Sequence, residues 1–410
     1  MFVHRSVHPF IYLILILPFG VMGGYLSVAV AWQLRAAGVP VAEVAALIAL
    51  SYIPHMWKFV WAPIADTTLS RKAWYVIGCV LSALGIFAFG VYPATSSGIG
   101  VLSVVALIAN FAATFVGMSV ESLMAYQTPD AEKGRAGGWF QAGNLGGHGI
   151  GGGLGLWLAQ TLNENWMSSA IIGGACLLCC LALLFIAEPV VTHRSTSILR
   201  SLKDVGLDVW QTARARMGAI ALFLCFMPIG SGAASGLWSS VSADWHASAN
   251  TVALVTGVLN GLVAAAGCVV GGWVCDRLDR KTVYVMYGVL QGLCAVLMAV
   301  SSRTESMYVV FTLLYAYITG LTYAGFSAFV LEAMGRGAAA TKYNLFASLS
   351  NMPIAAMTAI NGWAYGVWGA SGMLFTEASV ALAGLLVFLV VIRVFGNERQ
   401  TGLSAPARMD

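Results

Sequence analysis

Lys58 lies inside an apolar stretch of the sequence, in the run Lys58–Asp66 (KFVWAPIAD). A lone ammonium in a bilayer costs roughly 2.5–3.5 kcal/mol on insertion scales, so such a residue must be paired or face a wet cavity. Glu121 occupies a similar depth in another apolar stretch. Lys58 precedes Asp66 by eight residues, Glu121 precedes Pro129 by eight, and each interval is about 12 Å of helix. An ion pair between the two would relieve both burial penalties.

This pair has two interpretations. It can be a fixed contact that only joins two helices, or Glu121 can carry a proton whose binding would free Lys58. Glu377 is a further acid well inside an apolar stretch and is a second candidate for carrying the proton. We therefore select Glu121, Lys58 and Glu377 as candidates for proton coupling, with the structural alternative open.

Gln141, Asn144 and His148 recur at spacings of three and four residues, so they share one face of a helix. They lie in a glycine-rich segment, 137–153. Its glycines allow close approach between membrane helices, and the lysine of a phosphate-binding loop is absent. The polar face can line a solute cavity or join helices by hydrogen bonds. The remaining candidates for solute contact are His55, Tyr25, Trp238, Asn260, Tyr323 and Asn351.

The composition predicts a membrane protein. Of the 410 residues 59% are hydrophobic and only 9% are charged, whereas soluble domains carry about 25% charged residues. At roughly 20 residues per spanning helix, the length accommodates twelve helices with short loops. The apolar runs are continuous, unlike the alternating segments of a β-barrel. The expected spans are 10–34, 41–65, 73–94, 98–126, 136–160, 166–188, 218–242, 250–275, 282–302, 306–334, 340–362 and 370–393.

The distribution of basic residues predicts the orientation. With both termini in the cytoplasm, eighteen of the 21 lysines and arginines fall on the cytoplasmic side, while Arg35 and Arg303 fall on the other side and Lys58 lies inside. This asymmetry follows the positive-inside rule. We expect a multi-pass protein of the cell inner (cytoplasmic) membrane, and the net charge of +4 gives no indication of a nucleic-acid partner.

The chain reads as two related halves. The longest polar stretch, 189–217, separates six spans from six, and its apolar residues suggest a short amphipathic helix at the membrane surface. Asp66 and Asp276 are 210 positions apart, and Asn144 and Asn351 are 207 apart. A near-constant offset indicates duplication, as in transporters with pseudo-symmetric halves. The expected units are 1–188 and 218–393, two six-helix bundles, with a cytoplasmic linker at 189–217 and a cytoplasmic tail at 394–410.

Nothing in the sequence points to an enzyme. The eight cysteines all fall within or at the ends of apolar spans, and neither a metal-ligand cluster nor a nucleophile–base spacing is evident. We expect no cofactor and no metal. The expected partners are a small-molecule solute, protons and the lipid bilayer, and the expected state is a monomer. A non-transporting receptor or a channel is the rival class.

Residues 272–281 (GWVCDRLDRK) resemble the inter-helix signature of the major facilitator superfamily, Gly-x-x-x-Asp-Arg-x-Gly-Arg-Lys, with Asp279 in place of a glycine. The copy that ends at Lys72 is degenerate, with Ala62 in place of the first glycine. An aspartate near a helix end, flanked by basic residues, can hold neighbouring helix ends in one state and release them in another. The candidates for gating are Asp66, Arg71, Asp276, Arg277 and Arg280.

The run Lys58–Asp66 is similar to the second-span signature of the AmpG-like muropeptide permeases and peptide–acetyl-CoA transporters within that superfamily. Segments 134–137, 152–159 and 327–330 also resemble this group. The resemblance implies the major facilitator fold and a proton-driven importer of a bulky solute, such as a muropeptide or an amino-sugar/peptide conjugate. A second acid of the muropeptide permeases is Tyr126 here, and their two extra spans are missing. Related siderophore importers are equally compact, so a siderophore is an alternative cargo. An acyl-CoA is a weaker one, because only Lys58 could face the polyanion.

Overall fold

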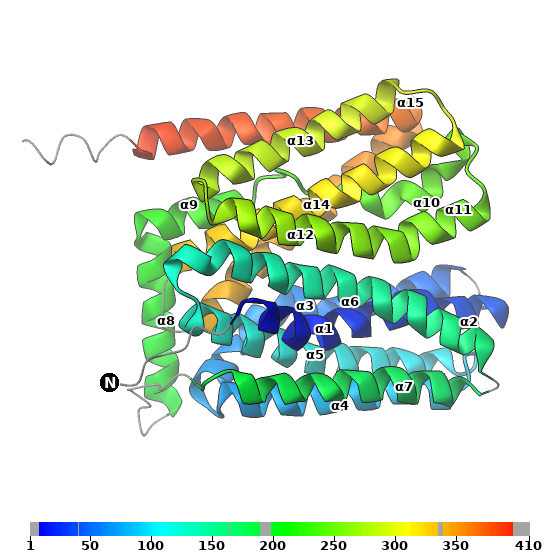
Figure 1. The fold of residues 1–410 in the computed structure, drawn as a ribbon, viewed down its shortest axis with the longest axis horizontal. Helices are drawn as coiled ribbons and strands as arrows, with labels where there is room; N and C mark the ends of the chain where they lie inside the picture. Colours follow the sequence, from blue (N-terminus) through cyan, green and yellow to red (C-terminus); the bar gives the residue numbers. More distant parts are fainter. Residues whose placement is uncertain (1–7, 40, 163, 189–197, 335–338, 397–410) are drawn as a thin grey trace, which may run out of the picture.

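The computed structural model describes residues 8–39, 41–162, 164–188, 198–334 and 339–396. These residues form helices joined by short connections, and none of them is in a strand. The prediction of an all-helical chain is confirmed. Figure 1 shows most helices running side by side along one direction, while α8 (Ile198–Arg214) crosses one end of the bundle. We call this end the α8 end. The predicted helix in the linker is present as α8.

Two groups of helices lie on either side of a central interface (Figure 1). The first group contains α1 (Phe10–Gly24), η1 (Tyr25–Val30), α2 (Ala31–Ala36), α3 (Val41–Thr67), α4 (Arg71–Val91), α5 (Ile99–Gln127), η2 (Asp130–Glu132), α6 (Lys133–Thr161), α7 (Asn165–Leu178) and η3 (Cys179–Phe185). The second contains α9 (Arg216–Cys225), η4 (Ala233–Leu237), α10 (Trp238–Val241), η5 (Ser242–Trp245), α11 (Ala249–Leu254), η6 (Val255–Leu259), α12 (Asn260–Cys275), α13 (Arg280–Val300), α14 (Glu305–Met334) and α15 (Ala339–Gly396). The exact unit boundaries stay a prediction, and most of the tail at 394–410 and part of the linker lie outside the described residues.

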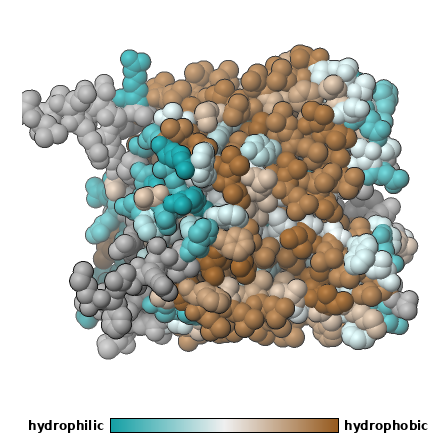
Figure 2. All heavy atoms as spheres, in the orientation of Figure 1, coloured by the Kyte–Doolittle hydropathy of each residue, from teal (hydrophilic) through white to brown (hydrophobic). Residues whose placement is uncertain are grey.

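The face of the molecule seen in Figure 2 is largely apolar along its side and more polar towards its ends. Figure 2 shows a broad hydrophobic band over the helices, with hydrophilic residues gathered at the ends. Within the described ranges, eight helices are long and apolar enough to cross a membrane. A helix that exposes large apolar side chains to its surroundings is stable in lipid rather than in water. The chain is therefore a multi-pass membrane protein.

Three predicted spans differ from simple helices. The spans expected at 340–362 and 370–393 belong to one long element, α15, in which Gly369 (φ 68°, ψ −169°) is the non-helical residue between two helices. The span expected at 218–242 is broken after α9, where Gly230 and Gly232 have positive φ angles of 58° and 67°. Such angles favour glycine because a side chain would clash with the backbone there.

Glycines bring α1, α6 and α12 into close contact. A Cβ atom on Gly20 would lie 2.2 Å from the carbonyl oxygen of Asn144, and one on Gly24 would lie 1.9 Å from that of His148. On the other side of α6, a Cβ on Gly138 would lie 2.5 Å from the carbonyl oxygen of Cys268. The predicted role of the glycine-rich segment in helix packing is confirmed, and α6 is one of the helices through which the two groups meet.

Candidate functional site

Lys58 and Glu121 form a buried ion pair between α3 and α5. Lys58 Nζ lies 3.2 Å from Glu121 Oε1, and the two residues are 7% and 3% exposed. The pair that the sequence suggested is present. A buried pair of this kind is costly to break from one side, because the remaining partner keeps its charge without compensation.

The second carboxylate oxygen of Glu121 contacts the other half of the molecule. Asn344 Nδ2, at the start of α15, donates to Glu121 Oε2 at 2.8 Å, and Asn344 is fully buried. One carboxylate therefore binds a lysine of its own half and an amide of the opposite half. Asn344 is not among the residues that the sequence selects for proton coupling. The available signal is that Asn344 is an amide within the predicted span 340–362, and a polar side chain there must face protein or water.

His55 lies one turn before Lys58 and is held by α5. Its Nε2 atom is 3.1 Å from Asn110 Oδ1, while its Nδ1 atom is buried without a hydrogen-bond partner among the described residues. One turn beyond Lys58, Trp61 Nε1 donates to Thr114 Oγ1 at 3.0 Å. These contacts fix the rotation of α3 on α5, and this rotation directs Lys58 towards Glu121.

The polar residues of α6 form hydrogen bonds to two neighbouring elements, α14 and η1. Gln141 Nε2 donates to Ser327 Oγ of α14 at 2.8 Å, and Asn144 Nδ2 donates to Gln141 Oε1 at 3.1 Å. Tyr343 also donates to Ser327, at 3.0 Å. His148 Nε2 instead lies 3.2 Å from Ser27 Oγ in η1. In this conformation the face joins helices, and Gln141 with Asn144 belongs to the interface between the halves.

The other predicted solute contacts are scattered. Tyr25 and Trp238 are correctly placed on spans, yet they are 0% and 1% exposed, so neither reaches a solute in this conformation. Tyr25 packs against Gly155, and Trp238 meets the ring of Tyr315 edge-on at 5.1 Å. Asn260 and Tyr323 are half-buried, and Asn351 is exposed.

Glu377 is buried in the second half, apart from the Lys58–Glu121 pair. It is 2% exposed and accepts hydrogen bonds from Ser231, Tyr315 and Asn361. The described residues therefore contain a buried carboxylate in each half, one paired with a lysine and one surrounded by neutral donors.

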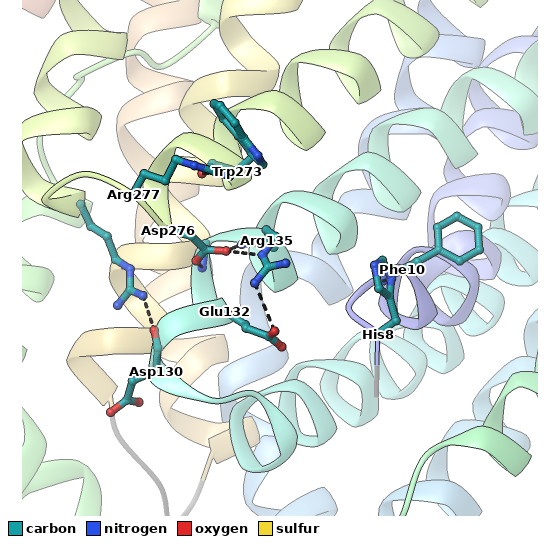
Figure 3. Close-up of polar contacts among 10 residues, drawn as sticks. His8, Phe10, Asp130, Glu132, Arg135, Trp273, Asp276 and Arg277 are labelled. Atoms are coloured by element: carbon teal, nitrogen blue, oxygen red, sulfur yellow. Dashed lines mark hydrogen bonds and ion pairs between the residues drawn. The ribbon is translucent and has the colours of Figure 1, made fainter. Parts of the chain in front are cut away.

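Asp276 joins the halves at the α8 end, as Figure 3 shows. Its carboxylate accepts from the backbone N–H of Gly134 at 2.7 Å, from that of Arg135 at 3.0 Å, and from Arg135 Nε at 2.8 Å. These N–H groups belong to the first turn of α6, where a helix has unsatisfied donors and a positive dipole end. An aspartate at the end of α12 thus caps a helix of the opposite half.

Asp66 makes the related contact from the first half. Its Oδ2 atom accepts from the backbone N–H of Thr341 at 2.8 Å and from the Thr341 hydroxyl at 2.7 Å, in the first turn of α15. Gly134 and Thr341 are 207 positions apart, close to the 210 that separate Asp66 from Asp276. The duplicated aspartates therefore cap duplicated helices, each across the interface.

The three predicted gating arginines behave differently. Arg71 stays within the first half, donating to Ser122 and lying 4.5 Å from the ring centre of Tyr126. Arg277 is exposed and lies over the ring of its neighbour Trp273 at 3.5 Å (Figure 3). Arg280 alone of the three bridges the halves, because it donates to the carbonyl oxygen of Asp130. Arg135, which the sequence did not select, is the arginine that pairs with Asp276.

A hollow of about 570 Å³ opens beside the start of α1, lined by His8, Phe10, Ile11, Trp139 and Phe185. Its lining is mostly apolar and includes none of the predicted proton, solute or gating residues. We do not assign the solute pathway to this hollow.

Comparison with known proteins shows that the sequence matches a protein family. A family model described as Major Facilitator Superfamily matches residues 10–230. The anhydromuropeptide permease of Escherichia coli (strain K12) is 22% identical over 356 residues, which cover 82% of this chain and 70% of the permease. The anhydromuropeptide permease of Escherichia coli O157:H7 matches with the same figures.

Solved structures share the fold. The E. coli fucose:proton symporter FucP superposes with a TM-score of 0.72 at 15% identity, covering 95% of this chain and 99% of FucP. The human organic anion transporter MFSD10 superposes with a TM-score of 0.69 at 16% identity, covering 95% and 100% of the two chains. These identities are low, and the likeness is one of fold alone.

Proposed function

The chain belongs to the Major Facilitator Superfamily, and from this premise we propose that it is a proton-coupled transporter that imports a bulky polar solute across the cytoplasmic membrane. The observation that carries the proposal is the position of Glu121, whose two oxygens contact Lys58 of its own half and Asn344 of the other half. A proton that binds there changes a contact within one half and a contact between the halves together.

Glu121 would couple proton binding to the joining of the halves. While the carboxylate is ionised, it holds both the Lys58 ammonium and the Asn344 amide through charge-assisted hydrogen bonds. A proton on Glu121 removes the charge, weakens both bonds and leaves Lys58 as an uncompensated cation. That cation is stabilised by water or by a polar solute, which favours a state in which the α8 end is open. Release of the proton restores the joined state.

The caps at the α8 end would form the gate for alternating access. Asp276 on α6 and Asp66 on α15 each bind a helix start of the opposite half, so opening this end must break both sets of bonds. We assign the α8 end to the cytoplasm, because the basic residues of the loops concentrate on that side in the sequence. Both termini then lie in the cytoplasm.

We propose that the cargo is a muropeptide or a related amino-sugar/peptide conjugate. Two proteins similar to this chain are anhydromuropeptide permeases, which supports that class. The predicted solute contacts are amides, hydroxyls, histidines and one indole, and they suit a large solute that forms many hydrogen bonds. A coenzyme A ester is a poorer fit, since Lys58, the basic side chain deepest within a span among the described residues, is already paired with Glu121. A siderophore is the alternative cargo.

Uptake into proteoliposomes tests the proposal. With an inward pH gradient, wild-type protein should accumulate labelled anhydromuropeptide. Glu121→Gln should lose accumulation while keeping solute counterflow, because only the coupling charge is removed. Glu43→Gln is the matched control, since it makes the same change at an exposed side chain in the first turn of α3, 15 residues before Lys58. Normal accumulation by Glu121→Gln would assign coupling elsewhere, and solute-independent current without counterflow would indicate a channel.

A thermal-shift screen tests the cargo separately. Purified protein is heated with anhydromuropeptides, ferric siderophores and coenzyme A esters in turn. Stabilisation by anhydromuropeptides is expected, because a ligand that binds only the native state raises its stability. Stabilisation by a siderophore or a coenzyme A ester alone would replace the proposed cargo.

A further inference from the structure

Glu377 sits in a cluster of neutral hydrogen-bond donors. Its Oε1 atom accepts from Tyr315 OH at 2.8 Å and from Ser231 Oγ at 3.2 Å, and its Oε2 atom accepts from Asn361 Nδ2. These donors come from α14, from the break that follows α9, and from an earlier part of α15. The residue is 2% exposed, so water does not provide the remaining solvation.

No basic side chain among the described residues pairs with Glu377. Arg303 is the cation that reaches this end of α15, and it donates to Ser371, six residues (about 9 Å of helix) before Glu377. The titratable group in contact with the carboxyl is the Tyr315 hydroxyl, and Cys294 on α13 interacts in turn with Tyr315. The desolvation cost of this buried carboxylate is therefore offset by hydrogen bonds from neutral donors and not by a counter-charge.

The cluster has more acceptors than donors. Asn361 Oδ1 and Gln291 Oε1 are buried without a hydrogen-bond partner among the described residues, although both side chains are at most 1% exposed. The unpartnered oxygen of Asn361 belongs to the same amide that binds Glu377. A proton on the Glu377 carboxyl would add a donor to a network that lacks one.

The same cluster holds the break in the second half. Residues 226–232 leave the helix between α9 and η4, and Gly230 and Gly232 adopt positive φ angles there. Ser231 lies between these glycines, donates to Glu377, and accepts from the backbone N–H of Ala233 at 3.3 Å. Discontinuous membrane helices commonly form the substrate and coupling-ion sites of transporters.

We infer that Glu377 is a second proton-binding site, whose occupancy controls the break at 226–232. It lies eight residues after Gly369, about 12 Å of helix from the end opposite α8, whereas Glu121 lies nearer the α8 end. When Glu377 is ionised, Ser231 and Tyr315 donate to a charged acceptor, and the Ser231 bond keeps segment 226–232 in its observed conformation. When it is protonated, those bonds weaken and the break loosens. The inference rests on the proposed function only in treating the protein as proton-coupled.

Hydrogen exchange of the backbone amides in 226–237 tests this inference without any solute. After correction for the intrinsic effect of pH on exchange, wild-type protection should fall as pH is lowered, by up to about tenfold per pH unit over the transition. Glu377→Gln imitates the neutral acid and should show the low protection at every pH. Tyr315→Phe, which removes one donor and keeps the carboxyl, should retain a pH response if Glu377→Gln folds poorly.

Glu121→Gln separates this inference from the proposed function. It should keep the pH response of 226–237, since its carboxylate belongs to the other half. Wild-type protection that does not change with pH would overturn the inference, as would a response that survives in Glu377→Gln. If the amides of 226–237 were protected in Na⁺ but not in K⁺, and Glu377→Gln lost this protection, the site would bind sodium. That result would overturn the assignment to a proton.

Discussion

Breaking the Lys58–Glu121 pair from one side should destabilise the protein more than removing both charges. Removing one partner of a buried pair costs about 3–5 kcal/mol, because the other charge is left uncompensated. The Asn344 hydrogen bond to Glu121 persists in Lys58→Met and offsets part of this cost, since a bond to a charged group contributes about 1.5–3 kcal/mol. We therefore expect a loss of roughly 2–4 kcal/mol for Lys58→Met.

The double variant Lys58→Met/Glu121→Gln should lie within about 1 kcal/mol of wild type, because it leaves no stranded charge. The assay is reversible unfolding in mixed micelles, followed by far-ultraviolet circular dichroism. The loss in the free energy of unfolding caused by Lys58→Met should decrease by up to about 1.4 kcal/mol per pH unit as pH is lowered. The reason is that the unpaired carboxylate of Glu121 then binds a proton in the native state. A double variant as unstable as the sum of the two single variants would refute the reasoning.

Three further predictions concern the interface and the packing. Gly24→Ala should cost about 1–3 kcal/mol of stability, because its Cβ would lie 1.9 Å from the carbonyl oxygen of His148, whereas Gly174→Ala has open space and should be neutral in the same unfolding assay. Asp276→Asn should speed maleimide labelling of Cys268, which packs against Ala142 across the interface, but not of Cys294 inside the second half, as read by mass spectrometry. If Asp276→Asn left the labelling rate of Cys268 unchanged, or raised the rates of both cysteines by the same factor, the result would count against a gate at Asp276. Asn344→Ala should lower proton-driven accumulation while keeping counterflow, because it removes the cross-half contact of Glu121; unchanged accumulation in proteoliposomes would show that this contact is not used.

The ion pair, and the equivalence of Asp66 and Asp276, could be predicted from the sequence for a simple reason. Charged residues inside spans are few and must be compensated, so depth along the helix was enough to match Lys58 with Glu121. The repeat offset similarly marked Asp66 and Asp276 as equivalent, and the structure places both on helix starts of the opposite half.

Other contacts depend on how helices rotate and pack, which a single sequence does not specify. Asn344 reaches Glu121 only because α15 begins beside α5, and Tyr25 is hidden because Gly155 allows α6 to approach it. The break at 226–232 requires glycines that fit against neighbouring threonines: a Cβ on Gly230 would lie 2.5 Å from Thr322 Cγ2. The hydropathy of the sequence indicates only an apolar segment there, so it predicts a continuous span and not the break.

The central claim is that Glu121 binds the proton that moves with the solute. The most direct measurement traps a pH-sensitive dye inside proteoliposomes and adds anhydromuropeptide outside without an imposed gradient. Wild-type protein should acidify the interior when solute is added, and Glu121→Gln should transport solute down its gradient with no pH change. Acidification of the same size in Glu121→Gln, at equal solute flux, would contradict the account.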